Sequence, residues 1–202
     1  MRLPYVPNPP HFDSAADQAI VARVQERRGD RGLQELDLAL LHAPPVADGW
    51  NSFLGAIRTR TTLPDSIRET AICRVAVLNR AWYEWMHHAP LLRAAGDVDE
   101  QDLEYIVKRR PATQTQREGG TAVEESVRPS RLTEKHLSVL EYTDAMTMDV
   151  SVPEEVFQKL RSLFSEREVV EITATVSAYN CVSRFLVALD VGEKNDDTGP
   201  DQ

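Results

Sequence analysis

The chain has 202 residues, 42% of them hydrophobic, which suits one globular domain, or two small similar halves, with a core large enough to fold unaided. Its 32 acidic and 23 basic residues give a net charge of -9, so no broad basic surface is expected for nucleic acid. The longest apolar runs, such as AICRVAVL, are too short to span a bilayer, and the amino terminus lacks the features of a secretory signal. We therefore expect a cytoplasmic protein with no membrane partner.

The amino-terminal part begins with an extended arm. Residues 1–12 contain four prolines, which fix φ and remove backbone donors. Over residues 13–28 the apolar positions recur at helical spacing, and Gly29 ends the pattern. Further helical segments are predicted at 33–41 and, after a pair of prolines, at 46–57.

Prolines also bound the helices of the middle part. Pro64 opens a helix whose apolar positions continue to Leu78. The next helix carries the stretch AWYEWMHHAP, and we expect Pro90 to limit it, because proline lacks a donor and disfavours helical geometry at the residue before it. A continuation over 91–95 after a kink is left open. One more short helix is predicted at 99–109.

The carboxyl-terminal part follows a polar, glycine-containing stretch, about 111–130, that we expect to be a mobile loop. Helices are then predicted at 133–150, 153–164 and 165–189. The charged tail, 191–202, is expected to be disordered. Since no segment shows the period of a strand, the sequence predicts an all-α fold with one helical domain over residues 13–190.

A short internal repeat supports this organisation. Residues 66–69 and 165–168 both read Ser-x-Arg-Glu, and both lead into a long apolar helix. The pattern fits a capping box, in which the serine and the glutamate satisfy each other's free backbone donors. It indicates two related helical halves separated by the loop.

The two cysteines give no sign of redox or metal chemistry. Cys73 and Cys181 lie far apart, and neither has a CxxC or CxxH spacing near it. This argues against a disulfide framework, a zinc knuckle and a dithiol centre, so we expect two buried, unreactive thiols.

The stretch at residues 81–90 gathers a carboxylate, a phenol and two imidazoles. Residues four apart lie over one another on a helix, so Glu84 is expected beside His88 and Tyr83 beside His87. A carboxylate favours the charged form of a neighbouring imidazole and holds one tautomer, which suits proton transfer near neutral pH. His88, Glu84 and Tyr83 are therefore candidates for catalysis, and His87 is a candidate for binding the substrate.

Other residues are candidates for the same site. Trp82 and Trp85 are expected to wall it and exclude water, which strengthens polar contacts inside. Glu69, one helix upstream, is a further candidate catalytic carboxylate, although a first-turn acid favoured by the helix dipole is the alternative. Arg74 and Arg80 are candidates for binding a substrate carboxylate through two hydrogen bonds.

Two other interpretations of the same stretch remain open. The tryptophans can belong to the core while Glu84 and His88 form an ordinary helical pair. Glu84-x-x-His87 also matches half of a di-iron motif, but the sequence holds no second copy, so no metal is expected.

Two segments, RETAICRVAVLNRAWYEWMHHAPLLRAAG at 68–96 and SEREVVEITATVSAYNCVSRFLVAL at 165–189, resemble the carboxymuconolactone decarboxylase family within the alkylhydroperoxidase D-like superfamily. The resemblance implies an all-helical homo-oligomer, commonly a trimer or hexamer. It also implies activity without a cofactor on a small lactone carboxylic acid.

The peroxidase branch of that superfamily has a Glu followed by a Cys-x-His-Cys-x-x-x-His segment. Aligned with this chain, the Glu falls on Glu69, the last His on His88 and the middle His on Tyr83, whereas the two cysteines fall on Ala81 and Glu84. Alanine and glutamate supply neither the thiolate nor the resolving thiol, so thiol-dependent peroxidase activity is not expected.

The sequence thus predicts an enzyme in which His88, oriented by Glu84, acts as general acid and base, while Tyr83 or an arginine stabilises developing negative charge. The expected substrate is a small organic acid or lactone, and the reaction a decarboxylation, an isomerisation or lactone chemistry. The alternatives are a non-catalytic oligomeric protein, in which Glu84 and His88 serve the subunit contact, and a metal-binding variant.

Overall fold

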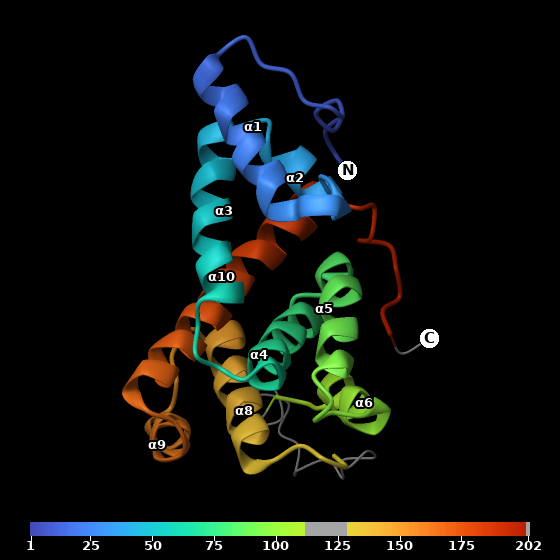
Figure 1. The fold of residues 1–202 in the computed structure, drawn as a ribbon. Helices are drawn as coiled ribbons and strands as arrows, with labels where there is room; N and C mark the ends of the chain where they lie inside the picture. Colours follow the sequence, from blue (N-terminus) through green and yellow to red (C-terminus); the bar gives the residue numbers. More distant parts are fainter. Residues whose placement is uncertain (112–128, 201–202) are drawn as a thin grey trace.

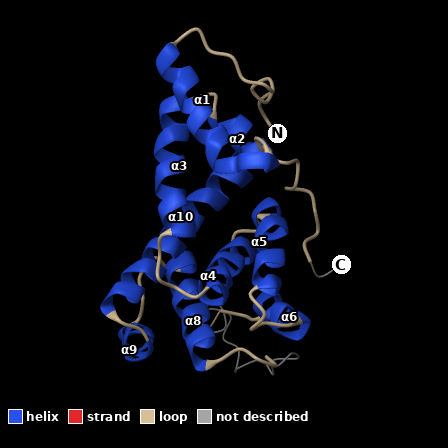
Figure 2. Cartoon of the chain, in the orientation of Figure 1, coloured by secondary structure: helices blue, strands red, loops and turns tan. Residues whose placement is uncertain are grey.

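The structure is a computed structural model that describes residues 1–111 and 129–200, and every regular element in these residues is helical, as predicted (Figures 1 and 2). The elements are α1 (Ala15–Arg28), η1 (Gly29–Arg31), α2 (Glu35–Leu40), α3 (Pro44–Thr59), α4 (Asp65–Leu78), α5 (Trp82–Ala94), α6 (Glu100–Lys108), α8 (Glu134–Met148), α9 (Glu154–Leu163) and α10 (Glu166–Leu189).

The helices form two groups joined by α10. In Figure 1, α1, α2 and α3 lie above, and α4, α5, α6, α8 and α9 lie below. Helix α4 is central to the lower group and packs on α5, α8 and α10, while α3 packs on α1 and also contacts α10. Ten of the fourteen residues of α4 are buried, and they include the polar residues Ser66, Glu69, Thr70 and Arg74 as well as apolar ones.

Helix α10 is the one described helix that is long and apolar enough to cross a membrane by length and composition. We predicted from the sequence that the apolar runs are too short to span a bilayer, and that prediction did not take account of α10. In the structure α10 contacts α3, α4, α5, α8 and α9, and it buries residues such as Ile172, Val176 and Tyr179. The molecule therefore resembles a soluble helical domain with α10 as a core helix.

The expected end of α5 at Pro90 is wrong, because the helix continues to Ala94. Proline within a helix removes the hydrogen bond to the carbonyl four residues earlier, here that of Met86. Met86 and Pro90 are both exposed, so water can reach the carbonyl that loses its partner.

The Ser-x-Arg-Glu repeat is a capping box at only one of its two sites. Ser165 caps α10 and exchanges hydrogen bonds with Glu168. At the other site the N-cap is Pro64, and the Ser66 hydroxyl instead donates to Asp97. The side chain of Glu69 therefore takes no part in a capping box, and it is buried in the core.

The amino-terminal arm packs against the end of α10 and the start of the tail. In the arm, residues 1–12, the backbone N–H of Arg2 donates to the carbonyl of Leu189. In the tail, Val191 is buried and the N–H of Gly192 donates to the Tyr5 hydroxyl at 2.8 Å. The disorder expected for 191–202 thus does not hold for residues 191–200. Most of the predicted loop at 111–130 lies outside the described residues.

Candidate functional site

A cavity of about 270 Å³ lies between the amino-terminal helices and the helices α5 and α10. From α5 it is lined by Tyr83, Glu84, His87 and His88, and from α10 by apolar residues that include Val182. The helical spacing of the motif therefore brings its polar side chains to one cavity. Its volume suits a small metabolite, since it falls below the roughly 300–1,000 Å³ common for drug-sized ligands.

His88 is held at both ring nitrogens. Its Nδ1 lies 2.7 Å from Oε2 of Glu69, and its Nε2 lies 3.3 Å from the hydroxyl of Tyr179. That hydroxyl accepts a hydrogen bond from Nε of Arg58 at 2.7 Å, so its own proton is free to point to Nε2 of His88. We infer from this network that Nδ1 carries the ring proton, toward Glu69, and that Nε2 is the acceptor.

The environment of His88 favours the neutral ring. Burial lowers the pKa of His88 below its usual value, and the hydrogen bond and charge of Glu69 oppose that effect only in part. A ring with a lowered pKa is unprotonated at neutral pH and can take up a proton there. Glu69 therefore has the orienting role that we expected of Glu84.

Glu84 is the second titratable group of the cavity, and it does not pair with His88 as expected. Its two carboxyl oxygens lie 3.2 and 3.1 Å from the hydroxyl of Ser183, which donates to them. Burial raises the pKa of Glu84 well above its usual value, against the lowering effects of Ser183 and Arg58. Glu84 therefore keeps its proton to a higher pH than an exposed glutamate does.

Tyr83 and His87 are neighbours as predicted, but the Tyr83 hydroxyl has a different partner. The Nδ1 of His87 lies 2.8 Å from the backbone carbonyl oxygen of Tyr83, and the two rings are 4.4 Å apart. The Tyr83 hydroxyl donates to Glu35 at 3.0 Å, and burial together with this carboxylate raises the pKa of Tyr83. The hydroxyl is thus engaged away from His88, and the expected charge-stabilising role does not fit it.

The sequence analysis missed the arginines of the cavity, which are Arg27, Arg28, Arg31 and Arg58. Arg58 comes four residues after Leu54, so it falls on the apolar face of the predicted helix, and a charge in that position was a usable signal. Arg27 and Arg28 lie in the last turn of a helix, where basic residues are common, so the sequence did not indicate that they line the cavity.

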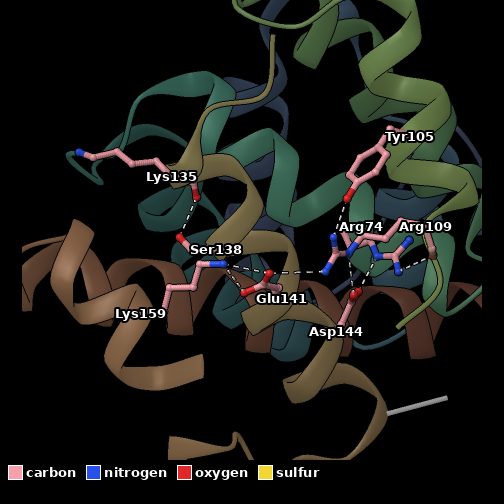
Figure 3. Close-up of polar contacts among 8 residues, drawn as sticks. All are labelled: Arg74, Tyr105, Arg109, Lys135, Ser138, Glu141, Asp144 and Lys159. Atoms are coloured by element: carbon pink, nitrogen blue, oxygen red, sulfur yellow. Dashed lines mark hydrogen bonds and ion pairs between the residues drawn. The ribbon is translucent and has the colours of Figure 1, made fainter. Parts of the chain in front are cut away.

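The two arginines that we assigned to substrate binding do not line this cavity. Arg74 is fully buried, and its guanidinium donates to Asp144 at 2.5 Å and to the carbonyl of Arg109 at 2.8 Å (Figure 3). The Arg74 guanidinium also donates to the carbonyl of Ile106 at 2.6 Å. It is a structural residue, because all three of its nitrogens are used within the protein. Arg80 is exposed at the end of α4, with φ of 52°.

The buried network around Arg74 joins several helices. Asp144 also accepts from Arg109, which bonds in turn to Tyr105, and Glu141 pairs with Lys159 of α9 (Figure 3). These contacts link α4, α6, α8 and α9 through charged groups that are paired with one another.

Trp82 and Trp85 do not wall the cavity as expected. They line a separate groove with Met86 and Pro90 of α5 and with residues 194–200 of the tail. Gly199, with φ of 84°, packs against the Trp82 ring, where a Cβ would come within 2.8 Å. The tail therefore covers the tryptophan side of α5, and the cavity that holds His88 opens elsewhere.

The cysteines differ from expectation in one respect. Cys73 is buried, and burial raises the pKa of its thiol, but Cys181 is exposed. Among the described residues, no three side chains of His, Cys, Asp or Glu are grouped so that they could hold a metal ion.

Comparisons with known proteins agree with this fold. Residues 44–123 match the model of the Carboxymuconolactone decarboxylase family. No functionally curated protein matches the chain.

Three solved structures show the same fold. An uncharacterized peroxidase-related protein from Silicibacter sp. TM1040 has 16% identity and a TM-score of 0.67, with 96% of this chain and 95% of that chain covered. An uncharacterized peroxidase-related protein from Ralstonia eutropha JMP134, an alkylhydroperoxidase AhpD core, has 15% identity and a TM-score of 0.65, with 94% and 90% covered. The debrominase Bmp8, as a cysteine-to-alanine variant with 2,3,4-tribromopyrrole, has 14% identity and a TM-score of 0.61, with 89% and 86% covered.

The family match over residues 44–123 and the shared AhpD-like helical fold agree with the residues from which we inferred the resemblance to the carboxymuconolactone decarboxylase family.

Proposed function

We propose that this protein is a cofactor-independent enzyme that transfers protons within a small organic acid or lactone, with His88 as the base and Glu84 as the acid. The reaction is a decarboxylation, an isomerisation or a reaction of a lactone ring. The observation that carries the proposal is that the imidazole of His88 and the buried carboxyl group of Glu84 line one small cavity, where burial lowers the pKa of His88 and raises the pKa of Glu84.

The opposite pKa shifts assign the two roles. A histidine with a lowered pKa is free to accept a proton, and a glutamate with a raised pKa has one to donate. Groups whose environments push their pKa values in opposite directions in this way form the usual acid and base pair of an enzyme. Each positioned group of this kind contributes about 10²–10⁴ in rate.

The contacts of His88 fit a base. Its Nε2 contact with Tyr179, at 3.3 Å, is long for a hydrogen bond from a hydroxyl, so substrate can replace it. When Nε2 takes up a proton, the ring becomes positive, and the Glu69 carboxylate at Nδ1 stabilises that charge. Glu69 thus acts on the reaction through His88.

A thiol mechanism does not fit the same positions. The residues that align with the two cysteines of the peroxidase branch are Ala81 and Glu84. Neither can form a sulfenic acid or a disulfide. The debrominase of the same fold, which was solved with a halogenated pyrrole, supports the fold as a host for a small cyclic ligand.

The test is a screen of small lactone acids and organic acids with purified protein, in which carbon dioxide release marks a lyase and new proton resonances mark an isomerase. For an active substrate, His88→Asn and Glu84→Gln are each expected to lower kcat by about 10²–10⁴. His11→Asn, at a fully exposed histidine, is the control. A loss of only a few-fold in His88→Asn removes His88 from the role of base.

A further inference from the structure

The cavity is strongly cationic, although the whole chain carries a net charge of -9. Its arginines come from three elements: Arg27 and Arg28 from α1, Arg31 from η1 and Arg58 from α3. Four arginines line the cavity and Glu84 is the one acidic residue among its described lining residues, so the arginines set the sign of the electrostatic potential inside it.

The four arginines of the cavity outnumber the carboxylates that pair with them. Asp37 lies 2.7 Å from Arg28 and 3.5 Å from Arg27 and so serves both. Neither Arg31 nor Arg58 has a carboxylate within 4.0 Å in the part of the chain that the structure describes. Burial and, after it, the nearby charge of Arg28 lower the pKa of Arg27 to about 10.

Arg58 is oriented so that its charged end is available. Its Nε donates to the Tyr179 hydroxyl at 2.7 Å, and its guanidinium carbon lies 5.5 Å from the centre of the Tyr179 ring. The two terminal nitrogens of Arg58 make no hydrogen bond to any described residue, and neither is a buried atom without a partner. They therefore face open space, and Arg58 lines the cavity.

We propose that Arg58 is the residue that binds the anionic group of the ligand, through a bidentate contact of its terminal nitrogens with a carboxylate, and that Tyr179 is the positioning residue that aims it. The placement of this carboxylate beside His88 rests on the proposed function, whereas the binding itself does not. Arg58 replaces Arg74 and Arg80, which the sequence suggested for the same task.

The chemistry of the site favours a carboxylate. The planar fork of a guanidinium matches the two oxygens of a carboxylate, and Tyr179 fixes the plane of that fork through Nε. Tyr179 also contacts Nε2 of His88, so the anchored group is held next to the base. The excess charge of the remaining arginines attracts the anion into the cavity.

The test uses binding rather than turnover. Succinate, its neutral analogue succinamide, and inorganic phosphate are titrated into the protein by calorimetry. Wild-type protein is expected to bind succinate in a saturable manner and more tightly than either of the others. Arg58→Gln is expected to weaken succinate binding by roughly ten- to hundredfold, the range of a hydrogen bond to a charged group. Arg60→Gln, at an exposed arginine just beyond α3, is the matched control and leaves binding unchanged.

Two more variants keep the test decisive if Arg58→Gln does not fold. Arg58→Lys keeps the charge but loses the fork, and Tyr179→Phe keeps the ring but loses the hydrogen bond, so both are expected to weaken succinate binding. In Tyr179→Phe the ¹⁵N shifts of His88 must also change, which a purely structural role for Tyr179 would not require. Equal affinity for succinamide, tighter binding of phosphate, or unchanged binding in the Arg58 variants overturns the proposal.

The same measurements separate this proposal from the proposed function. His88→Asn leaves the Arg58 terminal nitrogens in place and is expected to bind succinate within a few-fold of wild type. If succinate binding depends on Arg58 while His88→Asn retains full turnover of a substrate, the anion site stands and the acid–base mechanism fails.

Discussion

Oε2 of Glu69 lies 2.7 Å from Nδ1 of His88, although the two residues are nineteen positions apart in sequence and on different helices. Both side chains are buried, and Glu69 also has Nε of Arg68 at 3.4 Å. The contact exists because α4 and α5 pack closely together and Glu69 is not used as a helix cap. It fixes the orientation of the ring in the cavity.

The first prediction concerns this contact. Glu69→Gln keeps an acceptor for Nδ1 but removes the negative charge that raises the pKa of His88. We expect the pKa of His88 to fall further and kcat to drop by about tenfold or more, because the imidazolium formed during the reaction loses its partner. An NMR titration of the His88 ring measures the pKa, and Glu155→Gln on the surface of α9 is the control. A rise in the pKa would contradict the role given to Glu69.

The second prediction follows from the raised pKa of Glu84. In the unfolded chain this group ionises near its usual value of 4.5, whereas in the folded protein it keeps its proton to well above that pH. Between the two values the folded state binds more protons than the unfolded state, so the stability of the wild type falls as pH rises. The Glu84→Gln variant has no titrating group at this position, so its free energy of unfolding does not fall with pH for this reason.

The stability of Glu84→Gln relative to wild type is therefore expected to increase with pH above about 4.5, by at most about 1.4 kcal/mol per pH unit. Urea denaturation of both proteins at a series of pH values gives the difference in the free energy of unfolding. A difference that stays constant with pH would show that Glu84 is ionised in the folded protein at its usual pKa.

The third prediction distinguishes Tyr83 from Tyr179. The Tyr83 hydroxyl donates to Glu35 and not toward His88. Tyr83→Phe is therefore expected to cost about 0.5–1.5 kcal/mol of stability, the value of one hydrogen bond, with kcat within a few-fold of wild type. A loss of kcat of a hundredfold or more would restore Tyr83 as the group that stabilises charge in the reaction.

Much of the helical framework was predictable because local signals determine it. The structure contains the helices that these local signals mark: prolines in the first turn of α3 and at the N-cap of α4, the serine cap of α10 and the spacing of apolar residues. The prediction that Pro90 limits its helix was wrong, because the cost of the lost hydrogen bond depends on whether water can reach the free carbonyl. The sequence does not reveal that exposure.

The candidate site was predictable only in part, for a related reason. The spacing of residues along α5 brings Tyr83, Glu84, His87 and His88 to the cavity. It does not determine their partners, since Glu84 bonds to Ser183 of α10 and His88 to Glu69 of α4. Contacts between helices depend on packing angles and side-chain rotamers, which local periodicity does not specify.

The fourth prediction separates stability from binding at Arg74. Removal of this buried guanidinium leaves Asp144 with Arg109 as its remaining side-chain partner and leaves two backbone carbonyls without theirs. We expect Arg74→Met to lower the free energy of unfolding by about 3–5 kcal/mol, while exposed Arg80→Gln changes it by no more than about 0.5 kcal/mol. Denaturant unfolding measures both. An Arg74→Met protein of unchanged stability with a raised KM would return Arg74 to substrate binding.

The fifth prediction tests the non-catalytic alternative. Glu84 and His88 are 2% and 7% exposed within a single chain, and both have partners in that chain. A residue that serves a contact between subunits must present its side chain at the surface, as Met86 and Leu91 of the same helix do at 48% and 43% exposed.

We therefore expect the Glu84→Gln, His88→Asn double variant to keep the mass of the wild type in light scattering, where the family resemblance predicts a trimer or hexamer. Met86→Glu, at the exposed position between the two, is the comparison. If the double variant dissociates while Met86→Glu does not, the two buried groups support assembly. That result would contradict their assignment as the acid and the base of the reaction.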